Sequence, residues 1–249
     1  MAKSTTVIWF RQDLRLNDNP ALAAALKSDE IIPVYILDDT NPAAWSMGGA
    51  SRWWLHQSLT ALNADLDNEL WVLKGDPLTL LGALVKDHGV SNVVWNRAYE
   101  PWQTKRDTGL KNALSEFCEV KSFNGSMLWE PWTNLKDDGT PYRVFTPYYK
   151  RSIKDYAVRE PVNSRLKASK LARCSQPKNK IDALKLIPDH PWHLTLDEHW
   201  QPGEKGASKR LKKFLDNGLN TYKTGRDFPA QRSVSRLSPH IHFGEVSPN

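Results

Sequence analysis

The chain has 249 residues, 40% of them hydrophobic and 25% charged, and a net charge of +6, which is ordinary for a soluble globular protein with one complete domain and part of another. No apolar run approaches the roughly 18 residues needed to span a bilayer, and the first residues, MAKSTTVIWF, lack a signal-peptide core and cleavage site, so we expect a cytoplasmic protein that does not bind a membrane. The two cysteines, Cys118 and Cys174, have no metal-ligand spacing and suggest no disulfide framework.

Short β-rich apolar runs alternate with helical segments from the start of the chain. The first predicted strand is Thr6–Phe10, followed by a polar turn and a helix over PALAAALK. Asp18 or Asn19 caps this helix, and Pro20 occupies its first turn. The second strand is Ile31–Leu37, and a long helix with leucines at helical spacing is predicted over residues 50–67.

The same alternation continues to about residue 131. A third strand is predicted at Leu70–Leu73, followed by a helix that Asp76-Pro77 caps and Gly89 ends. The fourth strand is Val93–Trp95, a helix follows Trp102, and the fifth strand is Val120–Phe123.

This alternation predicts an α/β fold: a five-stranded parallel, Rossmann-like sheet with helices on both faces and the first strand in the centre. Such sheets bind ligands at the carboxyl ends of their strands. No G-x-G-x-x-G follows the first strand and no P-loop occurs, so the common nucleotide signatures are absent.

The pattern changes at about Trp132. Prolines punctuate residues 132–200, which show little periodicity, and we interpret them as a long linker draped over other elements. Helical periodicity returns at Lys205, where Leu211, Phe214 and Leu215 share a face and Gly218 stands at the stop position. A second domain is therefore predicted to begin within residues 201–249.

Positive charge is concentrated in the second half. Residues 1–131 carry 12 Lys+Arg against 16 Asp+Glu, whereas residues 132–249 carry 22 against 12. Such a surplus suits a polyanion-binding surface, because each phosphate contact releases counterions. A solvated, lysine-rich face explains the charge equally well.

The most informative stretch is residues 222–249, YKTGRDFPAQRSVSRLSPHIHFGEVSPN. It gathers Ser233, Ser235, Arg236 and Ser238, and Ser238-Pro239 is a good N-cap and N1 pair for a helix. Hydroxyl groups, a guanidinium and the N–H groups of a helix start together suit a pyrophosphate. From these residues alone, a capped turn without a ligand is the simpler interpretation.

Five stretches in order closely resemble the photolyase/cryptochrome family. They are VIWFRQDLRLNDNPAL at the start, GGASRWWLHQSL at 48–59, WNRAYEPW at 95–102, YRVFTPYYKR at 142–151, and Y-x-x-x-RDFP with SRLSP-x-x-x-x-GE-x-SP at 222–248. The resemblance implies an α/β domain over 1–131, an interdomain linker over 132–200, and the truncated start of an all-helical FAD-binding domain over 201–249. It also implies that the chain is the amino-terminal part of a longer protein, whose catalytic residues lie beyond Asn249.

The family's functional residues map onto the last stretch. By position, the residues that resemble the first FAD contacts, around the phosphates and ribose, are Tyr222, Val234, Ser235, Arg236, Leu237 and Ser238. Arg226 matches a family arginine that touches DNA phosphate. Many members have Thr where this chain has Val234, so here only the backbone N–H remains for contact.

The α/β domain of this family often holds an antenna pigment, either methenyltetrahydrofolate or 8-hydroxy-5-deazaflavin. Trp102-Gln103 stands where the bacterial folate pattern has Asn-Glu, which weakens that site, and Arg52 is similar to an arginine of the deazaflavin-binding branch. The resemblance does not choose between the two pigments, and some members carry none.

Several other residues are assigned to packing. The tryptophans interpreted as packing or antenna-pocket residues are Trp53, Trp54, Trp95, Trp102, Trp129 and Trp132. His240 and His242 have no third ligand nearby, so no metal site is predicted. No Ser-His-Asp or paired-carboxylate motif occurs, which fits chemistry carried by a cofactor.

As a whole, the resemblance implies a monomeric enzyme that splits cyclobutane pyrimidine dimers in UV-damaged DNA by electron transfer from light-excited, reduced FAD. A cryptochrome, a blue-light signalling receptor on the same scaffold, is the first alternative. A free-standing α/β binding module is the second, and the helix predicted over 205–219 with the cofactor signature after it argues against that reading.

Overall fold

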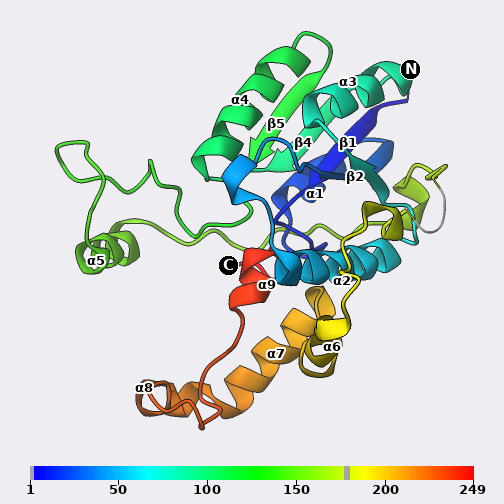
Figure 1. Ribbon diagram of the computed structural model, residues 1–249. Coiled ribbons are helices and arrows are strands. Elements are labelled where there is room, and N and C mark those ends of the chain that lie inside the picture. Colours follow the sequence, from blue (N-terminus) through cyan, green and yellow to red (C-terminus); the bar gives the residue numbers. More distant parts are fainter. Residues whose placement is uncertain (1–2, 177–179) are drawn as a thin grey trace.

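The computed structural model describes residues 3–176 and 180–249 and contains a five-stranded sheet that organises the core (Figure 1). The strands are β1 (Thr5–Phe10), β2 (Glu30–Leu37), β3 (Trp71–Lys74), β4 (Asn92–Asn96) and β5 (Glu119–Phe123). All neighbouring strands are parallel, in the order β3-β2-β1-β4-β5. The predicted sheet with its first strand in the centre is therefore confirmed.

Helices cover both faces of the sheet, as predicted. They are α1 (Pro20–Ala25), α2 (Gly49–Asp65), α3 (Pro77–Asp87) and α4 (Pro101–Leu114). Side chains alternate along β1, so that Ile8 and Phe10 pack with α1 and α2, whereas Val7 and Trp9 pack with α3 and α4. Figure 1 shows α3 and α4 on the opposite side of the sheet from α2.

The helix boundaries follow local capping chemistry. Of the two candidate caps, Asn19 caps α1, because its side chain accepts a hydrogen bond from Leu22 N at 3.0 Å. Asp76 caps α3 in the same way, with Thr79 N at 2.9 Å, and Gly89 follows α3 with a left-handed φ of 57°. Asp18 also has a left-handed φ, 45°, immediately before the α1 cap.

Much of the stretch between residues 132 and 200 lies against the sheet and its helices. Leu171 forms a parallel bridge to Ile31, and Lys170 donates to two carbonyl oxygens in the α1–β2 turn at 2.7 and 2.8 Å. Leu184 is buried in the core cluster that contains α2. The stretch also contains α6 (Leu194–His199) and three short 3-10 turns, at Ala168–Lys170, Asp182–Leu184 and Pro191–His193.

A further helix, α5 (Phe145–Asp155), was not predicted and projects from the rest of the molecule (Figure 1). One face is anchored by Asn134, which donates to the carbonyl oxygen of Tyr148 at 3.1 Å and to the Ser152 hydroxyl. Phe145 is 70% exposed and Ile153 57% exposed. The helix was missed because Pro147, in its first turn, belongs to the series of prolines that was interpreted as marking a linker.

The last part of the chain is helical. It contains α7 (Glu204–Asn217), a 3-10 turn at Leu219–Thr221, α8 (Tyr222–Gly225) and α9 (Ser238–His242). Gly218 stands at the carboxyl end of α7, as predicted. Leu215, on the predicted apolar face of α7, is 51% exposed.

Two local predictions are wrong. Leu237, not Ser238, is the N-cap of α9, and no side chain caps this helix, because the left-handed Arg236 already turns the chain into the helical path. Trp132 is 57% exposed, so it does not pack in the core. Its ring lies beside Tyr99 and within 5.8 Å of the Arg97 guanidinium.

Candidate functional site

A cavity of about 530 Å³ opens at the carboxyl ends of β1 and β2, beside the start of α4. This is the edge at which parallel sheets bind ligands. Aromatic rings make up much of its wall: Trp9, Tyr35, Trp45, Trp102 and Phe243. Polar and charged side chains complete it, namely Arg11, Gln12, Asp38, Asp39, Glu100, Gln103, Arg106 and His242. An aromatic wall with a few fixed polar groups is typical of a site for a flat organic ligand.

Trp9 contributes a buried ring to the wall of this cavity. Its indole is 1% exposed, and its Nε1 is a buried donor without an acceptor within residues 3–176 and 180–249. Arg11 and Arg106 lie over the ring, with their guanidinium carbons 4.8 and 4.9 Å from its centre. The two guanidinium groups hold the Trp9 ring in place within the cavity wall.

The two arginines that line the cavity are each paired with a carboxylate. Arg106 donates to Asp38 at 3.1 Å and to Asp107 at 2.9 Å, and Arg11 donates to Asp107 at 2.5 Å. Burial lowers the pKa of the Arg11 guanidinium, and the charge of Asp107 opposes that effect. Burial, with the nearby charge of Asp39, raises the pKa of Tyr35, so its hydroxyl keeps its proton at neutral pH.

Arg52, the predicted antenna residue, stands behind the cavity wall. It donates to Asp39 at 2.6 Å and to the carbonyl oxygen of Met47 at 3.1 Å, and both of those residues line the cavity. Arg52 therefore holds Asp39 and the backbone of Met47 in position within the cavity wall.

The predicted flavin contacts lie on the loop that joins α8 to α9 and on the start of α8. The hydroxyl groups of Thr221 and Ser233 are 3.0 Å apart, which ties the beginning of this loop to the turn before Tyr222. A side chain on Gly225 would overlap Ser233, so only glycine allows this approach. The backbone of Arg236 has a left-handed conformation, with a φ of 54°.

These flavin candidates differ in exposure. Leu237 is buried, and Ser235 is half-buried with its hydroxyl 3.4 Å from Leu237 N. The others are exposed: Tyr222, Val234, Arg236 and Ser238. Hydroxyl groups, a guanidinium and backbone N–H groups suit a diphosphate, and within the described residues this surface is open to solvent.

The loop and the cavity meet through α9. His242 and Phe243, at its carboxyl end, line the cavity, and Phe243 stacks on Trp54 with 6.1 Å between ring centres. Leu14 N donates to the carbonyl oxygen of Phe243 at 3.1 Å. No pattern in the sequence indicated that residues 242 and 243 belong to the cavity, because the contact spans most of the chain.

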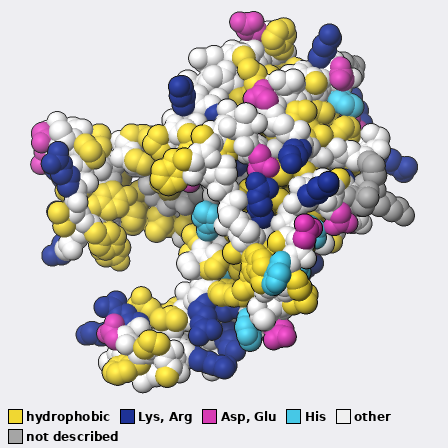
Figure 2. All heavy atoms as spheres, in the orientation of Figure 1, with side chains coloured by type: hydrophobic (Ala, Val, Ile, Leu, Met, Phe, Trp, Pro, Cys, Tyr) yellow, Lys and Arg dark blue, Asp and Glu magenta, His cyan; other side chains and the backbone are white. Residues whose placement is uncertain are grey.

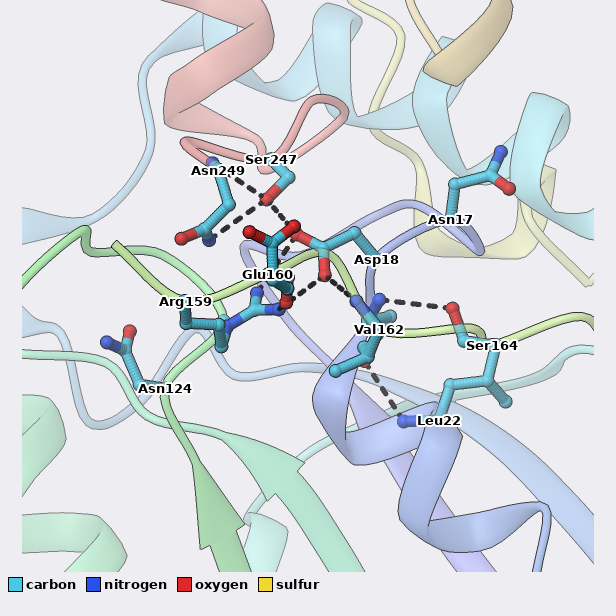
Figure 3. Close-up of polar contacts among 12 residues, drawn as sticks. Asn17, Asp18, Leu22, Asn124, Arg159, Glu160, Val162, Ser164, Ser247 and Asn249 are labelled. Carbon is cyan, nitrogen blue, oxygen red and sulfur yellow. Dashed lines mark hydrogen bonds and ion pairs between the residues drawn. The ribbon is translucent and has the colours of Figure 1, made fainter. Parts of the chain in front are cut away.

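A second network that the sequence did not reveal surrounds Asp18 (Figure 3). Its buried carboxylate accepts from Arg159 at 2.6 and 2.9 Å, from Val162 N at 2.7 Å, and from the Ser247 hydroxyl. Burial alone would raise the pKa of Asp18, but the hydrogen bonds from Arg159, Ser247 and Val162 outweigh it and hold that pKa below its ordinary value. One carboxylate thus joins the β1–α1 turn, the linker and the end of the chain.

The segment from α7 to the start of α9, residues 204–237, forms a basic lobe. Residues 204–236 carry nine Lys+Arg against three Asp+Glu, and Figure 2 shows Lys and Arg side chains gathered at this end of the molecule. Arg226 is exposed, with its guanidinium 5.7 Å from the ring centre of Tyr222. Burial lowers the pKa of Arg210, and the nearby charge of Arg236 adds to that effect.

Within the described residues, no candidate metal centre accompanies these features. Across the described ranges, no three His, Cys, Asp or Glu side chains stand close enough to share an ion. His240 is buried against Glu245, whereas His242 is exposed. The same ranges contain no helix long and apolar enough to cross a membrane.

Sequence comparison relates the chain to one family. The family model described as DNA photolyase matches residues 6–167. The deoxyribodipyrimidine photo-lyase of Agrobacterium fabrum is 41% identical, over 97% of this chain and 51% of its own length. Cryptochrome-2 of Arabidopsis thaliana is 33% identical, over 97% of this chain and 41% of its own length.

Structural comparison agrees. The crystal structure of a bacterial class III photolyase from Agrobacterium tumefaciens matches with a TM-score of 0.86 and 39% identity, over 100% of this chain and 52% of that chain. The Synechocystis cryptochrome shares the fold at a TM-score of 0.79. The chain spans about half the length of the curated relatives it matches.

Proposed function

The chain belongs to the DNA photolyase family, and from this we propose that it forms part of a deoxyribodipyrimidine photolyase, which splits cyclobutane pyrimidine dimers in UV-damaged DNA. In this proposal residues 1–131 form the antenna domain, residues 132–200 the linker, and residues 201–249 the beginning of the helical flavin domain. The observation that carries the proposal is the position of the 233–238 loop, whose groups suit a diphosphate, on a basic lobe that suits DNA.

The flavin would be held by the residues around that loop. Ser235, Ser238 and Arg236 offer hydroxyl and guanidinium donors to the diphosphate, and the backbone N–H of Val234 replaces the threonine contact of many relatives. Tyr222 contributes surface beside the loop, and the buried Leu237 anchors the end of the loop. Bound FAD supplies the light-driven electron donation that cleaves the dimer.

DNA would contact the basic lobe. Exposed cations bind the phosphate backbone without contacting the bases, so they bind DNA of any sequence, as a repair enzyme requires. Arg226 is the first candidate for such a phosphate contact. A damaged pyrimidine pair costs less to extrude from the stack than an intact one, so a surface that only holds the backbone can still select the lesion.

An antenna pigment would occupy the cavity at the carboxyl ends of β1 and β2. The aromatic wall and the polar side chains around it fit a flat pigment with hydrogen-bonding groups. Both methenyltetrahydrofolate and 8-hydroxy-5-deazaflavin satisfy this description, and Arg52 acts on either through Asp39. We further propose that the protein works as a monomer in the cytoplasm.

The test is repair in cells. The full-length protein, expressed in repair-deficient bacteria, should restore survival after UV irradiation when visible light follows and not when the cells stay dark. A cryptochrome is the second candidate, on the strength of the relative with that name. Flavin-containing protein that gives no light-dependent survival, and no loss of dimers from irradiated DNA, would favour the cryptochrome.

A further inference from the structure

One buried carboxylate, that of Glu245, lies where α2 of the sheet domain, the start of α7 and α9 meet. Glu245 is 1% exposed, and its Oε1 accepts from Trp54 Nε1 at 2.9 Å, from Gly203 N at 2.7 Å, and from the Ser58 hydroxyl. Its Oε2 is 2.5 Å from Nδ1 of His240. These donors come from α2, from the residue before α7 and from α9, so one side chain ties three separate segments together.

The backbone around Glu245 leaves it little freedom. Its neighbour Gly244 has a φ of 65°, and a side chain there would lie 2.5 Å from the Asp13 Cα. Gly203 has a φ of 98°, and a side chain there would lie 2.6 Å from the Ala61 Cβ. Both glycines let the chain press against the α/β domain. A buried carboxylate that accepts several hydrogen bonds has a sharply defined position. If it moved away from one of its donors, part of its negative charge would be left without a hydrogen bond in a site that water does not reach.

The flavin loop depends on this position. At its start the loop is tied by the hydroxyl pair of Thr221 and Ser233. At its end it runs directly into α9, where Leu237 is buried and His240 is bound to Glu245. Between these anchors, Val234 and Arg236 are exposed. The placement of the exposed groups is thus set by the anchors.

We propose that Glu245 is a positioning residue for the flavin: it holds α9, and through α9 the 234–238 loop, without touching the cofactor itself. This inference rests on the proposed flavin function. A carboxylate that only stabilises the core would affect the free energy of unfolding alone. A positioning residue also changes flavin affinity in molecules that are fully folded.

The test compares Glu245→Gln with wild type in the full-length protein. Glutamine keeps the size and one acceptor oxygen but presents an amide instead of a carboxylate oxygen to His240. FAD dissociation, followed by the fluorescence of released flavin, should show roughly tenfold weaker binding, which is the usual scale for losing a charge-assisted hydrogen bond. Amide hydrogen exchange should quicken at residues 237–244 and stay unchanged in β1, β2 and β4.

Glu204→Gln is the matched control. Glu204 accepts from Leu16 N and Asn17 N at 2.8 and 3.0 Å, so it belongs to the same interface but makes no bond to α9. This variant should leave FAD affinity unchanged. If Glu245→Gln fails to fold, Ser58→Ala removes a single donor to the same carboxylate and should weaken FAD binding by a smaller factor.

The outcomes separate the two proposals. Wild-type protein that takes up no FAD overturns the proposed function together with the role of Glu245. Wild-type protein that binds FAD, with folded variants at Glu245 and Ser58 that bind it equally well, overturns the positioning role alone. The positioning role is also overturned if Glu204→Gln weakens FAD binding as much as Glu245→Gln does. Such a result would mean that any damage to the interface weakens binding.

Discussion

Asp18 combines a left-handed backbone with a buried carboxylate that accepts from three directions. Asparagine also tolerates a left-handed φ, so Asp18→Asn isolates the charge. Because Arg159, Ser247 and Val162 hold the pKa of Asp18 below its ordinary value, its carboxylate stabilises the fold above the unfolded pKa of about 3.9. That stabilisation is lost as the pH falls through the lower, folded value.

We therefore expect Asp18→Asn to lower the free energy of unfolding by about 1–3 kcal/mol at pH 7. The difference from wild type should shrink in acid, where wild type loses the same interaction. Urea unfolding of both chains between pH 7 and pH 3 measures this. Asp67→Asn is the control, since Asp67 is exposed and has a similar φ of 52°. An equal loss in Asp67→Asn, or a difference that does not change with pH, would contradict the assignment.

Arg226 is the residue on which the DNA proposal is most directly tested. Arg226→Ala should weaken binding of the full-length protein to UV-damaged DNA to a similar extent on every sequence, and should reduce the salt slope by about one unit. Fluorescence anisotropy across a range of salt concentrations gives both quantities. Lys86→Ala removes an exposed cation from α3, away from the basic lobe, and should leave the slope unchanged. An unaltered slope in Arg226→Ala would remove Arg226 from the interface.

Among the elements, α9 is distinguished by its tight docking onto the β1–α1 turn. A side chain on Gly244 would overlap the carbonyl oxygen of Gln12, and its φ of 65° disfavours any other residue. Gly244→Ala should therefore lower the melting temperature markedly. Gly82→Ala, in α3 with no atom within 4 Å of the added carbon, should leave the melting temperature unchanged or raise it. Circular dichroism on heating compares them, and equal melting temperatures would show that the docking is loose.

The elements also show how far the sequence could predict this structure. Asn19 and Asp76 were identified as caps because each bonds an N–H only three residues away. Strands β1 to β4 were found because each lies in a short apolar run. The cap at Ser238 was predicted by the same local rule, but Arg236 is left-handed and the N-cap position falls on Leu237, one residue earlier.

What could not be predicted are the long-range partners of charged groups and of the cavity. Arg159 reaches Asp18 across 141 residues, and Phe243 enters a cavity built around β1 and β2. These contacts form only when helices and strands pack against one another. No residue pattern within either segment therefore indicates them. The resemblance suggested Arg52 as an antenna residue, but its ion pair with Asp39, a residue of the cavity wall, could not be read from the sequence.

For the whole molecule, the main expectation concerns flavin. The 234–238 loop offers phosphate-binding groups, but it is largely exposed, and a flavin gains its affinity from being mostly enclosed. Ordering such a loop around a ligand costs about 1–2 kcal/mol per residue. We expect these 249 residues, purified alone, to fold their α/β domain and to carry no stoichiometric FAD.

The visible absorption spectrum of the purified chain, set against its protein concentration, measures this. Far-ultraviolet circular dichroism provides the control that the α/β domain is folded. A flavin absorption band corresponding to one FAD per chain would show that the binding site is assigned to the wrong place.

The β1–α1 turn has a consequence for how the protein is made. Arg15 and Asp18 leave the ribosome early, yet both bond residues 229 positions later, Gly244 and Ser247. At about 5–20 residues per second, translation separates the two sides of these contacts by on the order of ten to fifty seconds. During that interval all five strands of the sheet can assemble, whereas the turn still lacks the carbonyl oxygen of Gly244 and the hydroxyl of Ser247. The turn therefore gains its full set of hydrogen bonds later in synthesis than the sheet does.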